Sequence, residues 1–183
     1  VTVSSVEFSD GFATDLAAIG RWCCDHGAYL VVDCAQSLGI MPMDVRRFHI
    51  DILAGLSSKW LLGPFSTGFL YVRKDLAQNL QPPFAGADSV KTDVGSIDCN
   101  LNWMDGAARF GMSLPNAPGI AGLHASLSLM EQTGFAAIHR EAWQVSGQLI
   151  RGLQELGAEI APCALRDETR STIVSFAPAS PQQ

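Results

Sequence analysis

Apolar residues along the first part of the chain fall into two patterns, short continuous runs and a helical spacing. Residues 1–8 (VTVSSVEF) and 29–33 (YLVVD) are short runs rich in β-branched residues, which is typical of strands. Between them, residues 15–25 carry apolar side chains three or four positions apart, at Leu16, Ile19, Trp22 and Cys23. The sequence therefore predicts a strand, a helix and a second strand parallel to the first.

Polar residues and glycine mark the limits of this predicted helix. Thr14 or Asp15 is the expected N-cap, because a short side-chain oxygen can accept a hydrogen bond from an unpaired backbone N–H group of the first turn. Gly27 is the expected end, since glycine adopts the left-handed conformation that follows many helices.

The same kind of pattern continues downstream. Residues 51–55 and 68–72 are again short apolar runs typical of strands, and residues 44–48 are expected to form a helical turn. Residues 74–103 contain several prolines and glycines and are expected to be irregular. We predict an α/β fold with a mostly parallel sheet and flanking helices.

Two long helical patterns fill most of the remaining chain. Residues 117–133 place Leu123, Leu127 and Met130 on one face, Gly134 breaks the pattern, and residues 135–156 resume it. Two strands are expected at residues 159–161 and 171–176. These strands indicate the start of a smaller second domain of the α+β kind.

Composition and charge narrow the class of protein. The chain has 183 residues, of which 48% are hydrophobic and 16% charged, so it can bury a sizeable core. Its net charge is −6 with no basic stripe, which disfavours nucleic acid and anionic membranes as partners. No apolar run reaches the length of a membrane span.

The cysteines and the first residue bear on the setting of the protein. The five cysteines show no CxxC or Cys/His metal spacing, so we expect reduced thiols, no metal site and a cytoplasmic location. Val1 lies inside a predicted strand, and this suggests a piece of a longer protein. Exposed apolar edges, poor solubility or association of pieces are then expected.

The candidate chemistry lies after two predicted strands. Asp33 ends one apolar run, and Lys59 stands alone in the uncharged stretch 52–72. Ligands of open parallel sheets bind at the carboxyl ends of strands, so Asp33 and Lys59 are expected to face one cleft. Lys59 has two interpretations: a side chain whose stem packs while its amine reaches water, or a partly desolvated amine that forms a Schiff base.

A Schiff-base lysine that acts on amino acids needs an electron sink, and pyridoxal phosphate supplies one. A carboxylate against the pyridine nitrogen keeps that nitrogen protonated, and Asp33 is the candidate. Gln36 is placed to reach the ring hydroxyl, and the hydroxyls of Ser57 and Ser58 could donate to the phosphate.

Three segments together resemble a known family. VVDCAQSLG at residues 31–39, DILAGLSSKWLLGP at 51–64 and TGFLYVRKDL at 67–76 are similar to the class V aminotransferases, which include cysteine desulfurases and selenocysteine lyases. The resemblance covers about residues 1–176. It implies the aspartate-aminotransferase fold (PLP fold type I), pyridoxal phosphate as cofactor, an amino-acid substrate and a homodimer for the full-length parent.

The resemblance also implies domain limits and site roles. Residues 1–116 would be the second half of the large cofactor-binding domain, and residues 117–183 the connecting helices and the start of the small C-terminal domain. Lys59 would be the Schiff-base lysine. The other cofactor-binding residues would be Asp33 at the pyridine nitrogen, Gln36 at the ring hydroxyl and Ser58 at the phosphate.

Some positions depart from the family pattern. Ser58 and Ser5 stand where many members have His. In ARFGMSLPN, at residues 108–116, Gly111, Ser113 and Leu114 replace the usual Glu and Gly-Thr of the segment that reaches the partner's cofactor.

Three functions remain open from the sequence. The first is a PLP-dependent enzyme of aminotransferase or lyase type, such as a cysteine desulfurase-like enzyme, of which this piece alone would be inactive. The second is an inactive or truncated relative with a binding or structural role. The third is a nucleotide-binding α/β domain, although the chain has no GxGxxG or GxxxxGK[ST] pattern.

Overall fold

A four-stranded sheet forms the centre of the structure, a computed structural model that describes residues 1–91, 101–112 and 114–178. The strand order is β1-β2-β3-β4. The first three strands are parallel and β4 is antiparallel to β3. The strands are β1 (Thr2–Ser4), β2 (Val31–Asp33), β3 (Ile52–Leu56) and β4 (Gly68–Val72). The predicted α/β fold with a mostly parallel sheet and flanking helices is confirmed.

Helix α1 (Leu16–Asp25) connects β1 to β2 as predicted. Asp15 is its N-cap: the N–H of Ala18 donates to Oδ1 of Asp15 over 2.9 Å. The apolar stripe of α1 and the faces of β2 and β3 bury a common core of Leu16, Cys23, Leu30, Val32, Cys34, Ile50 and Leu53. Trp22, placed in this stripe by the sequence, is instead 52% exposed and stacks on His26.

Strand β1 is shorter than the run of eight residues that the sequence predicts. After Ser4 the chain folds back on itself, with the N–H of Glu7 donating to O of Phe12 and that of Thr14 to O of Ser5. These hydrogen bonds replace a continued ladder with β2, so β-branched composition alone overestimates the strand.

The stretch expected to be irregular, residues 74–103, begins with one short helix, and a second short helix follows it. Helix α2 (Lys74–Asn79) buries Leu76 and Ala77 against Val72, and a 3₁₀ helix, η1 (Gly106–Phe110), packs beside it. The prediction of an irregular segment was therefore wrong for residues 74–79, because tertiary burial of two apolar side chains stabilises a helix too short to persist alone. Residues 92–100 lie outside the described residues.

The second half consists mainly of two helices and a small hairpin. Helix α3 (Ala117–Thr133) and helix α4 (Phe135–Glu155) meet at Gly134, which has a φ of +88°. Strand β5 (Glu159–Ile160), the 3₁₀ helix η2 (Pro162–Leu165) and strand β6 (Phe176–Ala177) follow. The strand predicted at residues 171–176 is almost absent, since within the described residues only Phe176 and Ala177 pair with β5.

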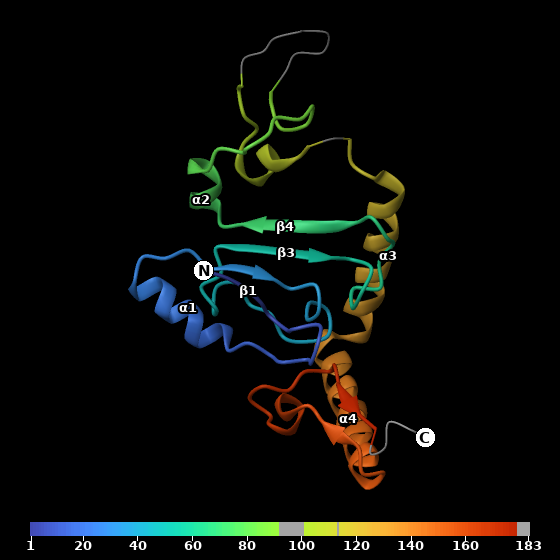
Figure 1. Ribbon diagram of the computed structural model, residues 1–183. Helices are drawn as coiled ribbons and strands as arrows, with labels where there is room; N and C mark the ends of the chain where they lie inside the picture. Colours follow the sequence, from blue (N-terminus) through green and yellow to red (C-terminus); the bar gives the residue numbers. More distant parts are fainter. Residues whose placement is uncertain (92–100, 113, 179–183) are drawn as a thin grey trace.

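Helix α3 runs across the end of the sheet to which the arrow of β3 points, whereas α2 lies at the opposite end (Figure 1). Small residues allow α3 to approach the loop between β3 and β4 closely. A Cβ on Gly122 would lie 2.5 Å from Cγ of Pro64, and the hydroxyl of Ser126 donates to O of Leu62 over 2.8 Å. Helix α3 thus covers the carboxyl edge of the parallel strands.

Within the described parts of the chain, no helix combines the length and the apolar character needed to cross a membrane. Several large apolar side chains are more than 70% exposed, namely Phe8, Phe65, Leu114 and Leu156. Poor solubility or association stays a prediction, and a monodisperse monomer in sedimentation would contradict it.

Candidate active site

The structure places Asp33 and Lys59 at the same edge of the sheet. Asp33 is the last residue of β2 and pairs in register with Ala54 of the neighbouring parallel strand β3. Lys59 follows three residues after Leu56, where β3 ends. Both side chains are exposed. The carboxyl ends of parallel strands form one edge, which is where such sheets bind ligands.

Two buried serines, Ser5 and Ser37, lie next to the backbone of Asp33, and Ser5 is hydrogen-bonded to it. The N–H and the hydroxyl of Ser5 donate to O of Asp33 over 2.8 and 2.9 Å, and the hydroxyl of Ser5 lies 2.6 Å from that of Ser37. Oδ1 of Asp33 accepts the N–H of Ala35 over 2.8 Å. The main chain and one carboxylate oxygen of Asp33 are therefore fixed by hydrogen bonds.

Ser5 belongs to this support and is buried, with 4% of its surface exposed. Sequence reasoning singled out Ser5 only as a position where relatives often carry His. In the structure the hydroxyl of Ser5 donates a hydrogen bond to O of Asp33, at the end of β2.

Gln36 and Cys34 differ in their surroundings. Gln36 is half-buried in the loop after β2. The thiol of Cys34 is fully buried and donates to O of Ala54 over 3.1 Å. Burial, and to a smaller extent the Asp33 carboxylate, raise the pKa of Cys34 to about 12. Cys34 is thus a packed, protonated thiol and a poor nucleophile at neutral pH.

The loop that carries Lys59 separates the two candidate serines. Ser58 is half-buried. Ser57 is fully buried, and its hydroxyl lies 2.9 Å from O of Pro64 and 3.0 Å from O of Thr67. The sequence suggested both serines as phosphate donors, whereas in the structure the Ser57 hydroxyl is used within the loop.

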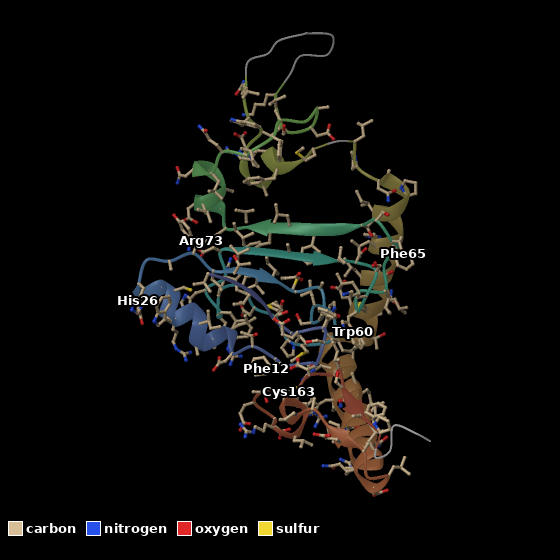
Figure 2. The ribbon with its side chains drawn as sticks, viewed as in Figure 1. Phe12, His26, Trp60, Phe65, Arg73 and Cys163 are labelled. Carbon is tan, nitrogen blue, oxygen red and sulfur yellow. The ribbon has the colours of Figure 1, made fainter. Side chains whose placement is uncertain are left out.

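The loops of Asp33 and Lys59 pack directly on each other. Gly39, in the first loop, has a φ of +99°. A Cβ at Gly39 would lie 2.7 Å from O of Trp60 and 3.0 Å from Cδ2 of Leu61. Sequence reasoning missed Gly39, although a glycine closing the run VVDCAQSLG was the available signal. Figure 2 shows Trp60 on the α3 side of the sheet and Arg73 at the other end.

Within the described residues, the charges of Asp33 and Lys59 are not paired with an opposite charge. No cluster of His, Cys, Asp and Glu suited to a metal ion occurs in the same set. The edge thus offers an exposed carboxylate and an exposed amine to a ligand.

The segment 108–116 starts far from this edge. Arg109 holds η1 against the end of α2, donating from Nη1 to O of Gln78 over 3.0 Å. The chain then leads to α3, and Leu114 is 82% exposed. Gly111 is half-buried, and Ser113 lies outside the described residues. The expectation that this segment reaches a partner subunit stays a prediction.

Comparison with known proteins extends this description. Residues 1–181 match the sequence model of the family described as Aminotransferase class-V. A probable cysteine desulfurase of Methanothermobacter thermautotrophicus is 36% identical over 149 residues, which cover 81% of this chain and 36% of the relative.

Solved structures give the same picture. A cysteine desulfurase from Thermococcus onnurineus in its apo form superimposes with a TM-score of 0.86 at 30% identity, covering 97% of this chain and 43% of that one. The cystine C-S lyase C-DES, in a variant with glycine covalently linked to its PLP cofactor, superimposes with a TM-score of 0.85 at 29% identity, covering 99% and 47%.

The fold and the sheet edge therefore define a protein of PLP fold type I. The chain belongs to the class V aminotransferase family and is similar to its cysteine desulfurases. It spans less than half of the length of these relatives.

Pyridoxal phosphate is the cofactor that the family and these neighbours indicate. The residues present fit part of this group. An exposed carboxylate at Asp33 suits a protonated ring nitrogen, and an exposed amine at Lys59 suits an aldehyde. Both project from neighbouring strand ends whose loops are in contact.

Proposed function

We propose that this chain is the lysine-bearing part of a PLP-dependent enzyme that acts on an amino acid, of aminotransferase or lyase type and cysteine desulfurase-like. The observation that carries this proposal is the position of Asp33 and Lys59 on adjacent parallel strand ends, in loops that pack through Gly39 and Trp60. The similarity to cysteine desulfurases supports the lyase chemistry.

Pyridoxal phosphate, when bound, supplies the electron sink for bond breaking at the substrate α-carbon. Lys59 would be the Schiff-base lysine that holds the cofactor through its amine, and the same amine would move the proton at the substrate α-carbon. Asp33 holds the ring nitrogen protonated, because its carboxylate stabilises the positive charge.

Two further residues complete the part of the site that we assign to this chain. Gln36 donates to the ring hydroxyl, and Ser58 donates to the phosphate. Ser58 is neutral, whereas many relatives have His there, so it contributes a weaker hydrogen bond than a charged donor would. Ser58 by itself would then hold the phosphate weakly.

The domain limits follow the same proposal. We assign residues 1–116 to the large cofactor-binding domain and 117–183 to connecting helices and the start of the small domain. The full-length parent would be a cytoplasmic homodimer, and its small-molecule substrate would be an amino acid. The exposed Leu114 near the start of α3 is consistent with a surface that meets a partner subunit.

Reductive trapping tests the role of Lys59. The chain has three lysines, Lys59, Lys74 and Lys91, so a borohydride-reduced adduct with pyridoxal phosphate can be assigned by peptide mapping. We expect label on Lys59, and none there in a Lys59→Arg variant, while Lys74→Arg leaves the Lys59 label unchanged. Equal labelling of all three lysines, as in nonspecific modification, would contradict the proposal.

An inactive relative with a binding or structural role is the second candidate. The family resemblance implies a hydrogen-bonding residue at the position of Leu114, whose apolar side chain cannot donate to a neighbouring phosphate. The same trapping experiment on a protein extended to the length of the relatives separates the two. Absence of label on Lys59 in that longer protein would favour the inactive relative.

A further inference from the structure

The strongest unassigned feature lies inside the loop that carries Lys59. Ser57 and Thr67 stand at the two ends of this loop, where β3 stops and β4 begins. Ser57 is fully buried and Thr67 is 9% exposed. Two adjacent hydroxyls buried at the base of a surface loop are costly unless each has a hydrogen-bond partner.

Both hydroxyls find partners across the loop. Oγ1 of Thr67 donates to O of Pro64 over 2.6 Å and contacts the hydroxyl of Ser57. The hydroxyl of Ser57 is also within reach of O of Thr67, at 3.0 Å. Each hydroxyl can therefore donate its one proton to a backbone oxygen: Thr67 donates to O of Pro64, and Ser57 donates to O of Thr67.

The backbone of Ser57 adds two more hydrogen bonds between the same ends. Its N–H donates to O of Thr67 over 3.1 Å, and its O accepts the N–H of Gly63 over 2.8 Å. We call this set of bonds between Ser57 and residues 63–67 the clasp. Every polar group of Ser57 is therefore committed to closing the loop.

The loop needs such a closure because part of its backbone is unfavourable. Leu62 and Ser66 have φ values of +55° and +60°, in the left-handed region that costs non-glycine residues roughly 1–2 kcal/mol each. The clasp encloses both residues. Strain of this kind persists only where surrounding contacts determine the backbone.

Packing on the clasp leaves little freedom. A Cβ on Gly63 would lie 2.8 Å from Cβ of Ser57 and 3.1 Å from Cδ1 of Leu123 in α3. A Cβ on Gly119, also in α3, would lie 2.3 Å from Cγ2 of Thr67. Helix α3 therefore packs directly against the clasp. The loop that carries Lys59 is thus held both by the hydrogen bonds of the clasp and by contact with α3.

We propose that Ser57 and Thr67 are positioning residues that hold the loop so that the amine of Lys59 faces the same edge as Asp33. This inference rests on the proposed function, since it assigns Lys59 to the cofactor. Both hydroxyls are buried and are bonded to backbone oxygens of the loop itself. A displacement of about 1 Å in a reacting group can reduce a rate on the order of 100-fold, so residues that only fix the loop of Lys59 can control this rate.

Matched variants at Thr67 test the clasp. Thr67→Val keeps the shape of the side chain and removes the hydroxyl, whereas Thr67→Ser keeps the hydroxyl. Thr133→Val removes a hydroxyl that bonds to O of Leu129 in α3 and serves as a control remote from the loop. Ser57→Ala removes the other half of the clasp.

The first measurement is backbone hydrogen exchange, made without cofactor. We expect the peptide covering residues 58–66 to exchange about tenfold faster in Thr67→Val and Ser57→Ala, with α1 unchanged. Thr67→Ser and Thr133→Val should match the original chain. Unchanged exchange of the loop in both clasp variants would overturn the clasp itself.

The second measurement is the rate of reductive capture of pyridoxal phosphate by Lys59, taken at a temperature where every variant is folded. We expect capture about tenfold slower in Thr67→Val and restored in Thr67→Ser. Faster loop exchange with unchanged capture would leave the clasp purely structural and overturn its positioning role. Failure of the original chain to label Lys59 would instead contradict the proposed function, and the positioning role with it.

Discussion

The carbonyl oxygen of Trp60 lies so close to Gly39 that a Cβ there would be only 2.7 Å away. Real Cβ atoms essentially never approach another heavy atom within 3.0 Å. The contact joins the loop of Asp33 to the loop of Lys59, and it exists because Gly39 has no side chain and a φ of +99°. Two residues separated by 21 positions thus hold the candidate site together.

Substitution of Gly39 by Ala is expected to push these two loops apart. The new Cβ meets backbone, which cannot turn away as a side chain can, so overpacking adds about 1–3 kcal/mol to the cost of a positive φ. We expect a lower free energy of unfolding in urea and slower capture of pyridoxal phosphate by Lys59.

Gly27→Ala is the matched control for this prediction. Gly27 has a φ of +62° with no heavy atom within 4 Å of an added Cβ, so the variant carries the conformational cost of roughly 1–2 kcal/mol without the clash. Equal loss of stability in the two variants would show that the Gly39–Trp60 contact contributes nothing.

Asp33→Asn separates the charge of Asp33 from its local role. Asn keeps an oxygen that can accept the N–H of Ala35, so the loop should stay folded. Loss of the carboxylate charge should weaken retention of pyridoxal phosphate by on the order of 10- to 100-fold, since a hydrogen bond to a charged group contributes about 1.5–3 kcal/mol.

Equilibrium dialysis of the cofactor measures this effect. Asp44→Asn is the control, because Asp44 accepts the N–H groups of Arg46 and Arg47 in a similar turn and is not one of the residues proposed to bind the cofactor. Equal cofactor retention in Asp33→Asn and the original chain would remove Asp33 from the proposed site.

Asp51 is expected to matter for stability and not for cofactor capture. It is 3% exposed, accepts the N–H of Leu30 over 2.7 Å and pairs with Nη1 of Arg73 at 2.5 Å. Asp51→Ala leaves the Leu30 N–H unpaired, which should cost about 1–3 kcal/mol in urea unfolding. Arg73 is half-exposed and stays hydrated, so it adds little to this loss.

Asp75→Ala removes the other carboxylate that contacts Arg73 and is the control for Asp51. Asp75 is exposed, and its ion pair with Nε of Arg73 at 2.7 Å is open to water, so stability should change little. A loss of stability in Asp75→Ala equal to that in Asp51→Ala would mean that burial of Asp51 is not the reason for its contribution.

The buried thiol of Cys34 is expected to lower the free energy of unfolding at high pH. Burial raises the pKa of its thiol from 9.0 to about 12, so the folded chain keeps the proton while the unfolded chain releases it. Below pH 9 the thiol is protonated in both states, so its ionisation does not lower the free energy of unfolding. As the pH rises from 9 to 12, the free energy of unfolding declines, with a slope of at most about 1.4 kcal/mol per pH unit.

Cys34→Ala should remove this part of the slope, even though its stability below pH 9 is lower because of the lost packing. Urea unfolding at several values between pH 8 and pH 11 measures the slope. A slope as steep in Cys34→Ala as in the original chain would assign the pH dependence to other groups, among them Cys163, whose pKa burial also raises.

Some elements could be read from local sequence because their causes are local. Helix α3 spans Ala117–Thr133 as predicted, since its helical run and the breaking glycine at Gly134 are neighbours along the chain. Strand β4 likewise coincides with the predicted run 68–72. The prediction of a strand at residues 171–176 was wrong for most of that range, because strand pairing depends on a distant partner. Strand β5 has only two residues that pair with β6.

Some features of the candidate site could likewise be predicted from the local sequence, and others could not. The amino-acid sequence by itself determined that Asp33 and Lys59 follow strand ends, because runs of β-branched and apolar residues specify short buried strands. Only the tertiary structure decided that Ser57 is buried while Ser58 is half-exposed, and that Gly39 meets Trp60. Burial and hydrogen-bond partners are set by segments distant in sequence, so local pattern cannot supply them.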